Sequence, residues 1–505
     1  MENNQSIFTR FLASGFFNIL RGGLTLVTTI LLARFLGVEN YGRMAFLLAS
    51  FLAFKSLLDM GSSHAFFTFL SEKTRSKKFI NIYLCWMACQ LVFSLLLVGL
   101  ILPDEVLEKV WVNESRFLII LALIGTFMQH SAWQVASQMA EAQRQTIKVQ
   151  KLGTAIIFIN LLIILLLEYA DLLTLPILFF ILSLEWFFGT LLAARMYVGL
   201  DDISDTFSTV WVEFWSYCKP FILYVWLIAL GEFLDRWMLQ IWGGNAEQSY
   251  YAIASNIMII VTVVVVSIIR ILWKEIAEAY HQGNIDLVKS LYQTTNRTIY
   301  LCAAFFIGAS LPWTSEILNI LVGSDYSAGN KTFMLMVIFT AHQSLGQING
   351  VLLLSTQKVK IHTIVGSLAS IAGIAFSYYM LAPADSTIPG LNMGSEGLAW
   401  KMVIINFLMV NALMYIISRQ FNWKHYWFYQ FYVLGFAVLI GFLLKSLVLS
   451  FFSSMYFSII ISLLLYTVIF GLLCYAFPML ALGIKRSNLI ESLSNFGIKS
   501  KFTNT

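Results

Sequence analysis

The chain contains few charged residues for its length. Only 12% of its 505 residues are Asp, Glu, Lys or Arg, against about 25% in soluble domains. Hydrophobic residues make up 59% of the chain, and the mean hydropathy is +0.78. This composition excludes an ordinary soluble protein and predicts an all-α polytopic membrane protein. The 32 Lys and Arg exceed the 27 Asp and Glu, but they form no nucleic-acid-binding face, so no nucleic-acid partner is expected.

Cysteines and catalytic motifs are also scarce. The five cysteines lie in or beside apolar segments without the spacing of metal ligands, which is typical of buried thiols. The sequence contains no GxSxG, GxxxxGK[ST] or HExxH motif that would indicate a hydrolase, a P-loop protein or a zinc protease. We therefore expect no enzyme activity, no metal and no cofactor.

Long apolar runs separated by short polar breaks fill the chain. Each exceeds or approaches the ~20 residues that cross a bilayer, and their connections leave no room for a soluble catalytic domain. The runs predict about fourteen transmembrane helices, at 10–36, 41–70, 79–102, 116–141, 152–168, 172–198, 214–242, 250–273, 297–322, 332–356, 361–382, 397–418, 428–449 and 455–482.

Every second connection is basic, beginning with the segment 72–78. Because Lys and Arg accumulate in cytoplasmic loops, both termini are predicted to be cytoplasmic. The acidic segment 199–213 does not fit this pattern, but Asp and Glu contribute little to orientation. Arg21 interrupts the first apolar run, so that run reads as a retained helix rather than a cleaved signal.

The first two apolar runs meet at a short hinge, Gly-Val-Glu-Asn-Tyr-Gly at 37–42, and a similar hairpin recurs when Gly37 is aligned with Gly243. This repeat predicts two pseudo-symmetric six-helix lobes followed by two further helices, an arrangement common in transporters. The expected parts are 1–198, a linker at 199–213, 214–418, and 419–505.

Several ionisable residues fall inside predicted helices, where each costs about 2.5 kcal/mol or more at the bilayer centre. Arg21 lies near the middle of its helix without an acidic residue within a turn, so it is expected to face a hydrated cavity unless another helix supplies an acidic partner. Lys55 and Asp59 are four residues apart and can pair. Arg270 lies near a helix end, where it can extend to the headgroups.

A second group forms an i, i+3, i+4 cluster of Glu232, Asp235 and Arg236. Arg236 can balance the two carboxylates, or the group can belong to an internal charge network that couples an ion. Asp59, Glu232 and Asp235 are the candidates for coupling to a proton or sodium gradient, since a carboxylate in a low dielectric can titrate near neutral pH. A cationic cavity would favour an anionic substrate, because arginine binds phosphate oxygens in bidentate geometry.

The segment LLARFLGVENYGRMAFLLA, at 31–49, resembles the end of helix 1 and the start of helix 2 in polysaccharide flippases. The resemblance is to the O-antigen flippase group (Wzx-type) of the multidrug/oligosaccharidyl-lipid/polysaccharide exporter superfamily. It implies two lobes around a cationic cavity in a bacterial inner membrane. The implied substrate is an undecaprenyl-diphosphate-linked oligosaccharide, such as an O-antigen repeat unit in lipopolysaccharide biosynthesis, flipped from the cytoplasmic to the periplasmic leaflet.

The resemblance also implies substrate contacts by Arg21, Lys55 and Arg270, which occupy helices that carry essential arginines in related lipid II flippases. Lys55 departs from arginine, so bidentate recognition is not expected there. Membrane lipids and other polysaccharide-assembly proteins are the implied partners. Two alternatives stay open: a multidrug or cation antiporter of the same superfamily, which would need an acidic cavity, and a membrane polysaccharide polymerase, which the short loops disfavour.

Overall fold

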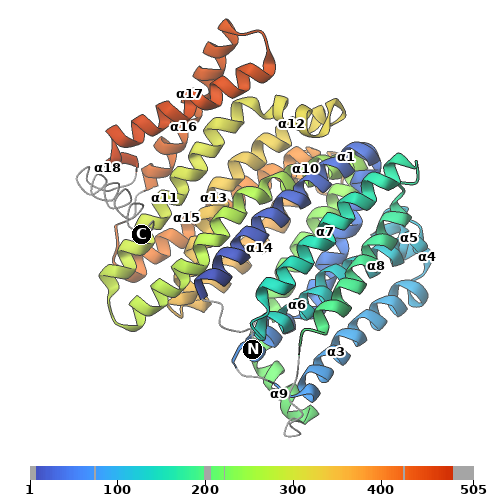
Figure 1. Cartoon of the computed structure of the whole chain (residues 1–505). Coiled ribbons are helices and arrows are strands. Elements are labelled where there is room, and N and C mark those ends of the chain that lie inside the picture. The colour runs from blue at the N-terminus through green and yellow to red at the C-terminus, as the bar shows by residue number, and fades with distance from the viewer. Residues whose placement is uncertain (1–6, 73–74, 198–205, 221, 425–426, 482–505) are drawn as a thin grey trace. The chain divides into compact units, whose positions relative to one another are not determined.

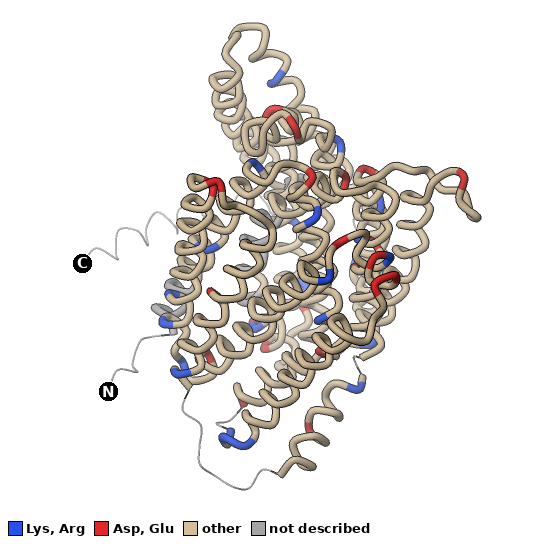
Figure 2. Tube along the Cα trace, turned by 90° about the vertical axis from the view of Figure 1, so that its right-hand side faces the viewer, with Lys and Arg blue, Asp and Glu red and all other residues tan. Residues whose placement is uncertain are grey.

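The computed structural model describes residues 7–72, 75–197, 206–220, 222–424 and 427–481, with the side chains of 7–14, 259–268, 270–271 and 480–481 left undescribed. Throughout these ranges the chain is built of helices, with no strand (Figure 1). The predicted all-α fold class is therefore confirmed. Uncharged positions make up most of the helices, as Figure 2 shows, which agrees with the composition.

The first half of the chain opens with one long helix and continues in shorter ones. Its elements are α1 (Ile7–Asp59), α2 (Ser62–Glu72), α3 (Lys77–Leu96), η1 (Leu97–Ile101), α4 (Asp104–Val110), α5 (Arg116–Phe127), η2 (Met128–Ala132), α6 (Trp133–Ala142), α7 (Thr146–Tyr169), α8 (Leu175–Ala194) and α9 (Phe207–Cys218).

The second half repeats the pattern of a long first helix. Its elements are α10 (Ile222–His281), α11 (Ile285–Ser310), η3 (Leu311–Trp313), α12 (Thr314–Val322), η4 (Ser324–Gly329), α13 (Asn330–Ser355), α14 (Val359–Leu381), α15 (Gly394–Phe421), α16 (Trp427–Phe451), α17 (Met455–Ala476) and α18 (Pro478–Ala481).

The two long helices, α1 and α10, are each broken at one glycine. In α1 the backbone of Gly37 has φ 70° and ψ 173°, and in α10 Gly244 has φ 79° and ψ −172°. Glycine alone adopts such angles at no steric cost. The sequence repeat predicts Gly243 as the counterpart of Gly37. In the structure the counterpart is Gly244, one residue further along the chain. The predicted polar hinges are therefore single-residue breaks rather than loops.

Ten helices in the described chain are long and apolar enough to cross a membrane, or up to eleven when α9 and the first part of α10 count as one bent span. One of the ten, 15–59, contains the break at Gly37 and so holds two of the predicted runs. Each of the fourteen predicted segments corresponds to a helical segment when α1 and α10 are divided at their glycines. The chain is a multi-pass membrane protein.

The chain forms two compact units, and each is described by itself below. Unit 1 comprises 1–260 with 370–398, and unit 2 comprises 261–369 with 399–505. The predicted lobes, 1–198 and 214–418, have other bounds and stay a prediction. In unit 1 a buried cluster around Phe66 and Phe79 joins α2, α3 and α9.

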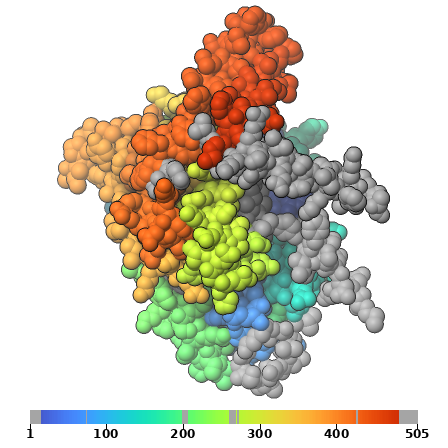
Figure 3. Space-filling view, turned by 90° about the vertical axis from the view of Figure 1, so that its left-hand side faces the viewer, coloured from blue at the N-terminus to red at the C-terminus, as the bar shows by residue number. Residues whose placement is uncertain are grey.

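Unit 2 has a core of its own, where Ile299 of α11, Leu352 of α13 and Leu413 of α15 belong to one buried cluster. The last helices of this unit, in orange to red, form one continuous surface in Figure 3. Lys445 of α16 joins them to the preceding elements, because its Nζ lies 2.6 Å from Oε1 of Glu316 on α12.

Candidate functional site

Unit 1 encloses a cavity of about 430 Å³ between α1, η2, α7, α8 and α10. Residues before and after Gly37 both line it, so the chain reverses direction at that glycine and α1 forms a hairpin. The lining residues are Thr25, Thr28, Thr29, Leu32, Tyr41, Met44, Ala45, Leu48, Ala49, Leu52, Gln129, His130, Ile156, Ile157, Asn160, Ile164, Leu178, Phe179, Leu182, Trp186, Arg236, Ala252 and Asn256.

Arg236 is the cationic side chain of this lining. Its Nη1 donates to Oε1 of Gln248 at 3.3 Å, and Nε2 of Gln248 donates to the Arg236 carbonyl at 3.2 Å. The guanidinium carbon lies 4.4 Å from the centre of the Tyr251 ring, a cation–π arrangement. Gln248 and Tyr251 follow the break at Gly244, so the second part of α10 holds Arg236 in place.

The neighbouring carboxylates do not line the cavity. Asp235 is buried and accepts a 2.5 Å hydrogen bond from Oγ of Ser377 on α14, whereas Glu232 is exposed. None of the lining residues, all of which lie in the described chain, is Asp or Glu. The cavity wall therefore carries a positive charge and no negative one.

Polar groups from α1, α7 and α10 add hydrogen-bonding capacity to the lining. Nδ2 of Asn256 donates to the Tyr41 hydroxyl at 3.2 Å, and Nδ2 of Asn160 donates to Oε2 of Glu185 on α8 at 2.7 Å. Oε1 of Glu185 is buried with no hydrogen-bond partner in the structure. Glu185 thus lies directly behind an amide that lines the cavity.

No sequence pattern indicates that Asn160, Asn256 and Glu185 belong together. They lie on α7, α10 and α8, and an uncharged amide inside an apolar run carries no pattern of its own. Arg236 was visible in the sequence as part of a charged cluster, but only the structure shows which way it faces.

Arg21 lies on α1 one turn before the lining residue Thr25. Its Nη2 donates to Oδ1 of Asn18 at 2.9 Å, and its Nη1 lies close to Gly153 of α7, 3.7 Å from where a Cβ would stand. Glu141 of α6 is near enough to interact with it electrostatically. Another helix therefore supplies the acidic neighbour that its own helix lacks, and substrate contact by Arg21 stays a prediction.

Lys55 and Asp59 have separate partners in the structure. Nζ of Lys55 donates to Oε1 of Gln134 on α6 at 3.3 Å. The Asp59 carboxylate accepts hydrogen bonds from the Ser62 hydroxyl at 2.9 Å and from the Ser63 hydroxyl at 2.8 Å and backbone amide at 3.1 Å. The Asp59 carboxylate therefore caps the start of α2. The sequence predicts a single helix over 41–70, which would join α2 to the second part of α1.

Arg270 lies in the second part of α10, in a stretch whose side chains are outside the described residues. Its expected contact with a substrate stays a prediction. Among the described side chains of Arg21, Lys55 and Arg236, only that of Arg236 lines the unit 1 cavity.

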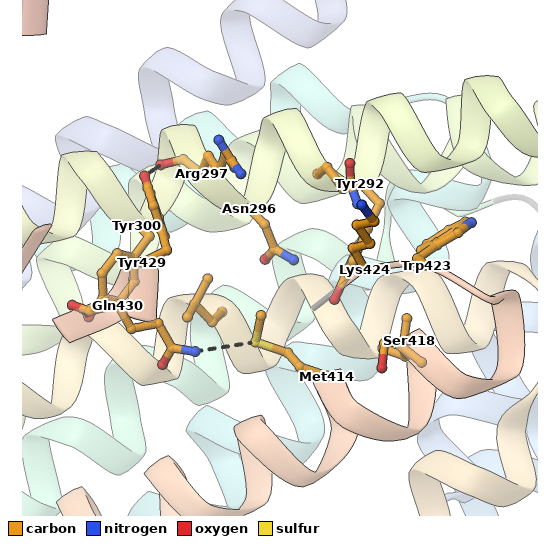
Figure 4. A pocket seen from close by; sticks show the side chains of 13 residues that line it. Tyr292, Asn296, Arg297, Tyr300, Met414, Ser418, Trp423, Lys424, Tyr429 and Gln430 are labelled. Carbon is orange, nitrogen blue, oxygen red and sulfur yellow. Dashed lines mark hydrogen bonds between the residues drawn. The ribbon is translucent and has the colours of Figure 1, made fainter. Parts of the chain in front are cut away.

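Unit 2 contains a smaller polar pocket of about 60 Å³ between α11, α13, α15 and α16. Figure 4 shows the Asn296 side chain directed into it, and the Oδ1 of this buried residue has no hydrogen-bond partner. Arg297 and Lys424 also line the pocket, and the Arg297 guanidinium carbon lies 5.2 Å from the centre of the Tyr429 ring. Within the described ranges, no group of three or more His, Cys, Asp or Glu side chains is placed to hold a metal ion.

Solved structures share this fold across nearly the whole chain. A lipid II flippase, MurJ, in an inward closed conformation matches with a TM-score of 0.69 and 14% identity over 94% of this chain and 99% of its own. A transporter of the MOP superfamily from Pyrococcus furiosus matches with a TM-score of 0.56 and 12% identity over 82% of this chain and 96% of its own.

An outward-facing multidrug resistance transporter of the MATE family, in the same superfamily, gives a TM-score of 0.56 and 12% identity over 83% of this chain and 97% of its own. No protein-family model matches the chain, and no curated protein matches it by sequence. The structural likenesses show that this multi-pass membrane protein has the fold of MOP-superfamily transporters.

Proposed function

We propose that the protein is a flippase that moves a polyprenyl-diphosphate-linked oligosaccharide between membrane leaflets by alternating access. The observation that carries the proposal is the unit 1 cavity, whose wall contains Arg236, amides and hydroxyls but no carboxylate. At 5 Å and an effective dielectric of about 20, one unit-charge pair is worth about 3 kcal/mol before desolvation. A diphosphate gains from such a wall, whereas a cationic drug would be repelled.

The fold supports the same proposal. The protein with the TM-score of 0.69 is described as a flippase for lipid II, and we carry over from it the idea of a lipid-linked substrate. The finer assignment follows the hinge sequence at 37–42: an undecaprenyl carrier, an O-antigen-like repeat unit, a bacterial inner membrane with both termini cytoplasmic, and cooperation with other polysaccharide-assembly proteins.

The residue roles divide between charge attraction and coupling. Arg236 is proposed to attract the diphosphate, together with Arg21, Lys55 and Arg270. Coupling to a proton or sodium gradient is proposed for the carboxylates. Among these, Asp59 and Asp235 already accept hydrogen bonds from serines, and Glu232 is exposed. Glu185, with one oxygen unpartnered, joins them because its other oxygen accepts a hydrogen bond from Asn160 of the cavity wall.

The test is reconstitution of the purified chain in lipid vesicles that carry a polyprenyl-diphosphate-linked oligosaccharide in one leaflet. A membrane-impermeant lectin then reports the sugar that reaches the other leaflet. We expect the wild-type chain to accelerate this appearance and Arg236→Gln and Arg21→Ala to lose most of the acceleration while staying folded. A rate equal to that of protein-free vesicles would contradict the flippase, and transport of a cationic dye instead would support the antiporter.

A further inference from the structure

Unit 1 holds a second cavity, of about 540 Å³, which shares no lining residue with the one described above. It lies between α3 and α9 and is bounded by the end of α1, the start of α2 and the start of α10. Its lining residues are Asp59, Met60, Ser62, Lys78, Asn81, Ile82, Tyr83, Cys85, Trp86, Cys89, Phe207, Val210, Trp211, Phe214, Trp215, Cys218 and Ile222. Most of this wall is apolar or aromatic.

Aromatic rings of α3 and α9 contact one another along the cavity. Trp86 of α3 meets Trp211 of α9 edge to face with ring centres 6.0 Å apart, and Phe207 stacks on Trp211 at 6.2 Å. Deeper in the unit, Tyr83 stacks on Phe214 at 5.4 Å. Each of these rings is packed against a neighbour, and all of them line the cavity.

Only two of the lining residues, Asp59 and Lys78, carry a charge, and they differ in how exposed they are and in their hydrogen-bond partners. Both carboxylate oxygens of Asp59 accept hydrogen bonds from Ser62 and Ser63. Lys78 is exposed in the first turn of α3, next to the exposed Lys77. Trp211 and Trp215 are also exposed, at 46% and 49%, and tryptophans with lysines are the residues that gather at a membrane interface.

We propose that this cavity binds one anionic phospholipid, with an acyl chain between α3 and α9 and the phosphate at Lys78. An apolar space in a multi-pass membrane protein is filled from the bilayer, where acyl chains are the abundant apolar material. The lysine selects among lipids, because one Lys near the surface contributes about 1 kcal/mol to binding anionic headgroups. The proposal does not depend on what the protein transports.

The test uses the purified full chain in detergent and a phosphatidylglycerol that carries a photoreactive diazirine at the end of one acyl chain. After illumination, mass spectrometry of peptides locates the label. We expect label on α3 and α9, competed by phosphatidylglycerol more strongly than by phosphatidylcholine. Lys78→Gln should lower the preference for phosphatidylglycerol about fivefold, the value of one interfacial lysine.

Cys85→Trp fills the cavity and should reduce labelling about tenfold, since each buried methylene contributes about fourfold to lipid affinity. The matched control is Val92→Trp, which introduces the same side chain two turns along α3 at a residue that is 54% exposed and outside the lining. Should Cys85→Trp fail to fold, alkylation of Cys85 in the wild-type chain replaces it. Bound phosphatidylglycerol is then expected to protect Cys85 from a maleimide.

Three results would overturn the proposal. One is equal labelling in the wild-type chain and a folded Cys85→Trp variant, or no protection of Cys85. Another is equal competition by phosphatidylcholine, which would remove the role of Lys78. The third is displacement of the probe by a polyprenyl phosphate at concentrations at which phosphatidylglycerol has no effect, which would assign the cavity to a prenyl chain.

Discussion

Gly42 and Asn245 pack backbone against backbone in unit 1, so closely that a Cβ at Gly42 would overlap the Asn245 carbonyl. Gly42 lies five residues after the break in α1, and Asn245 directly follows the break in α10. The two glycine-centred turns that the sequence showed as a faint repeat are therefore in direct contact.

Gly42→Ala should destabilise the protein by about 1–3 kcal/mol, the usual cost of forcing extra volume into a packed contact. The Asn245 backbone must shift to admit the methyl group. Thermal unfolding in detergent measures the effect. Gly22→Ala is the control, because no atom lies within 4 Å of a Cβ at Gly22, and alanine favours a helix over glycine. Equal stability of the two variants would contradict the close packing.

Arg236→Gln should reduce flipping up to about a hundredfold, if the ~3 kcal/mol of one charge pair is lost in full. Glutamine keeps hydrogen-bonding capacity toward Gln248 but removes the charge. The vesicle assay with the impermeant lectin measures it. Lys151→Gln, an exposed lysine on α7, removes a charge away from the cavity and should leave the rate unchanged. A similar loss in both variants would indicate an effect of net charge.

Glu185→Gln should uncouple transport from an ion gradient without abolishing binding. The glutamine can still accept from Asn160, whose Nδ2 lies 2.7 Å from Oε2 of Glu185, but it can no longer gain or lose a charge. Flipping is measured with and without an imposed proton or sodium gradient. Glu168→Gln, at the end of α7, is the control. A gradient response that survives in Glu185→Gln would exclude this carboxylate as the coupling group.

Glu114→Gln should destabilise unit 1 by about 1–2 kcal/mol. Both oxygens of Glu114 accept from Arg43, at 2.7 Å each, and the carboxylate is 5% exposed. The cost stays modest because the Arg43 side chain is 37% exposed and water can replace its partner. A double-mutant cycle with Arg43→Gln, followed by thermal unfolding, isolates the pair. A coupling energy near zero would show that the pair does not stabilise the fold.

The helices could be predicted from the sequence because apolar runs of membrane length have few other solutions. The break in the helix after Asp59 could not be predicted in this way. Lys55 and Asp59 both lie on α1, as a helix over 41–70 predicts, but α1 ends at Asp59 and Gly61 adopts φ 83° before α2 begins. The Asp59 carboxylate therefore accepts hydrogen bonds from Ser62 and Ser63 at the start of α2 instead of pairing with Lys55. The turn at Gly61 therefore decides which groups bind the Asp59 carboxylate, and the apolar pattern of the sequence contains no signal for that turn.

The candidate site was predicted only in part. The sequence marked Arg236 only as part of a charge cluster that balances Glu232 and Asp235 or couples an ion. Which side of a helix meets a cavity depends on neighbours distant in the chain, here α1, α7 and α8. Amides such as Asn160 leave no periodic signal, and their role follows from contacts between helices. Arg21 was identified from its missing partner on the same helix, whereas its acidic neighbour Glu141 comes from α6.

A joint of one residue restricts how two helices can move. At Gly37 and at Gly244 the chain reverses without spare length, so neither helix of a pair can advance along the other by a turn, which would require about 5.4 Å of slack. At each of these glycines the φ and ψ angles are the two backbone dihedrals that can change while both helices stay intact. Any rearrangement of these hairpins is consequently a rotation of one helix relative to the other about the glycine. A small rotation at the glycine separates the far ends of the two helices by a larger distance.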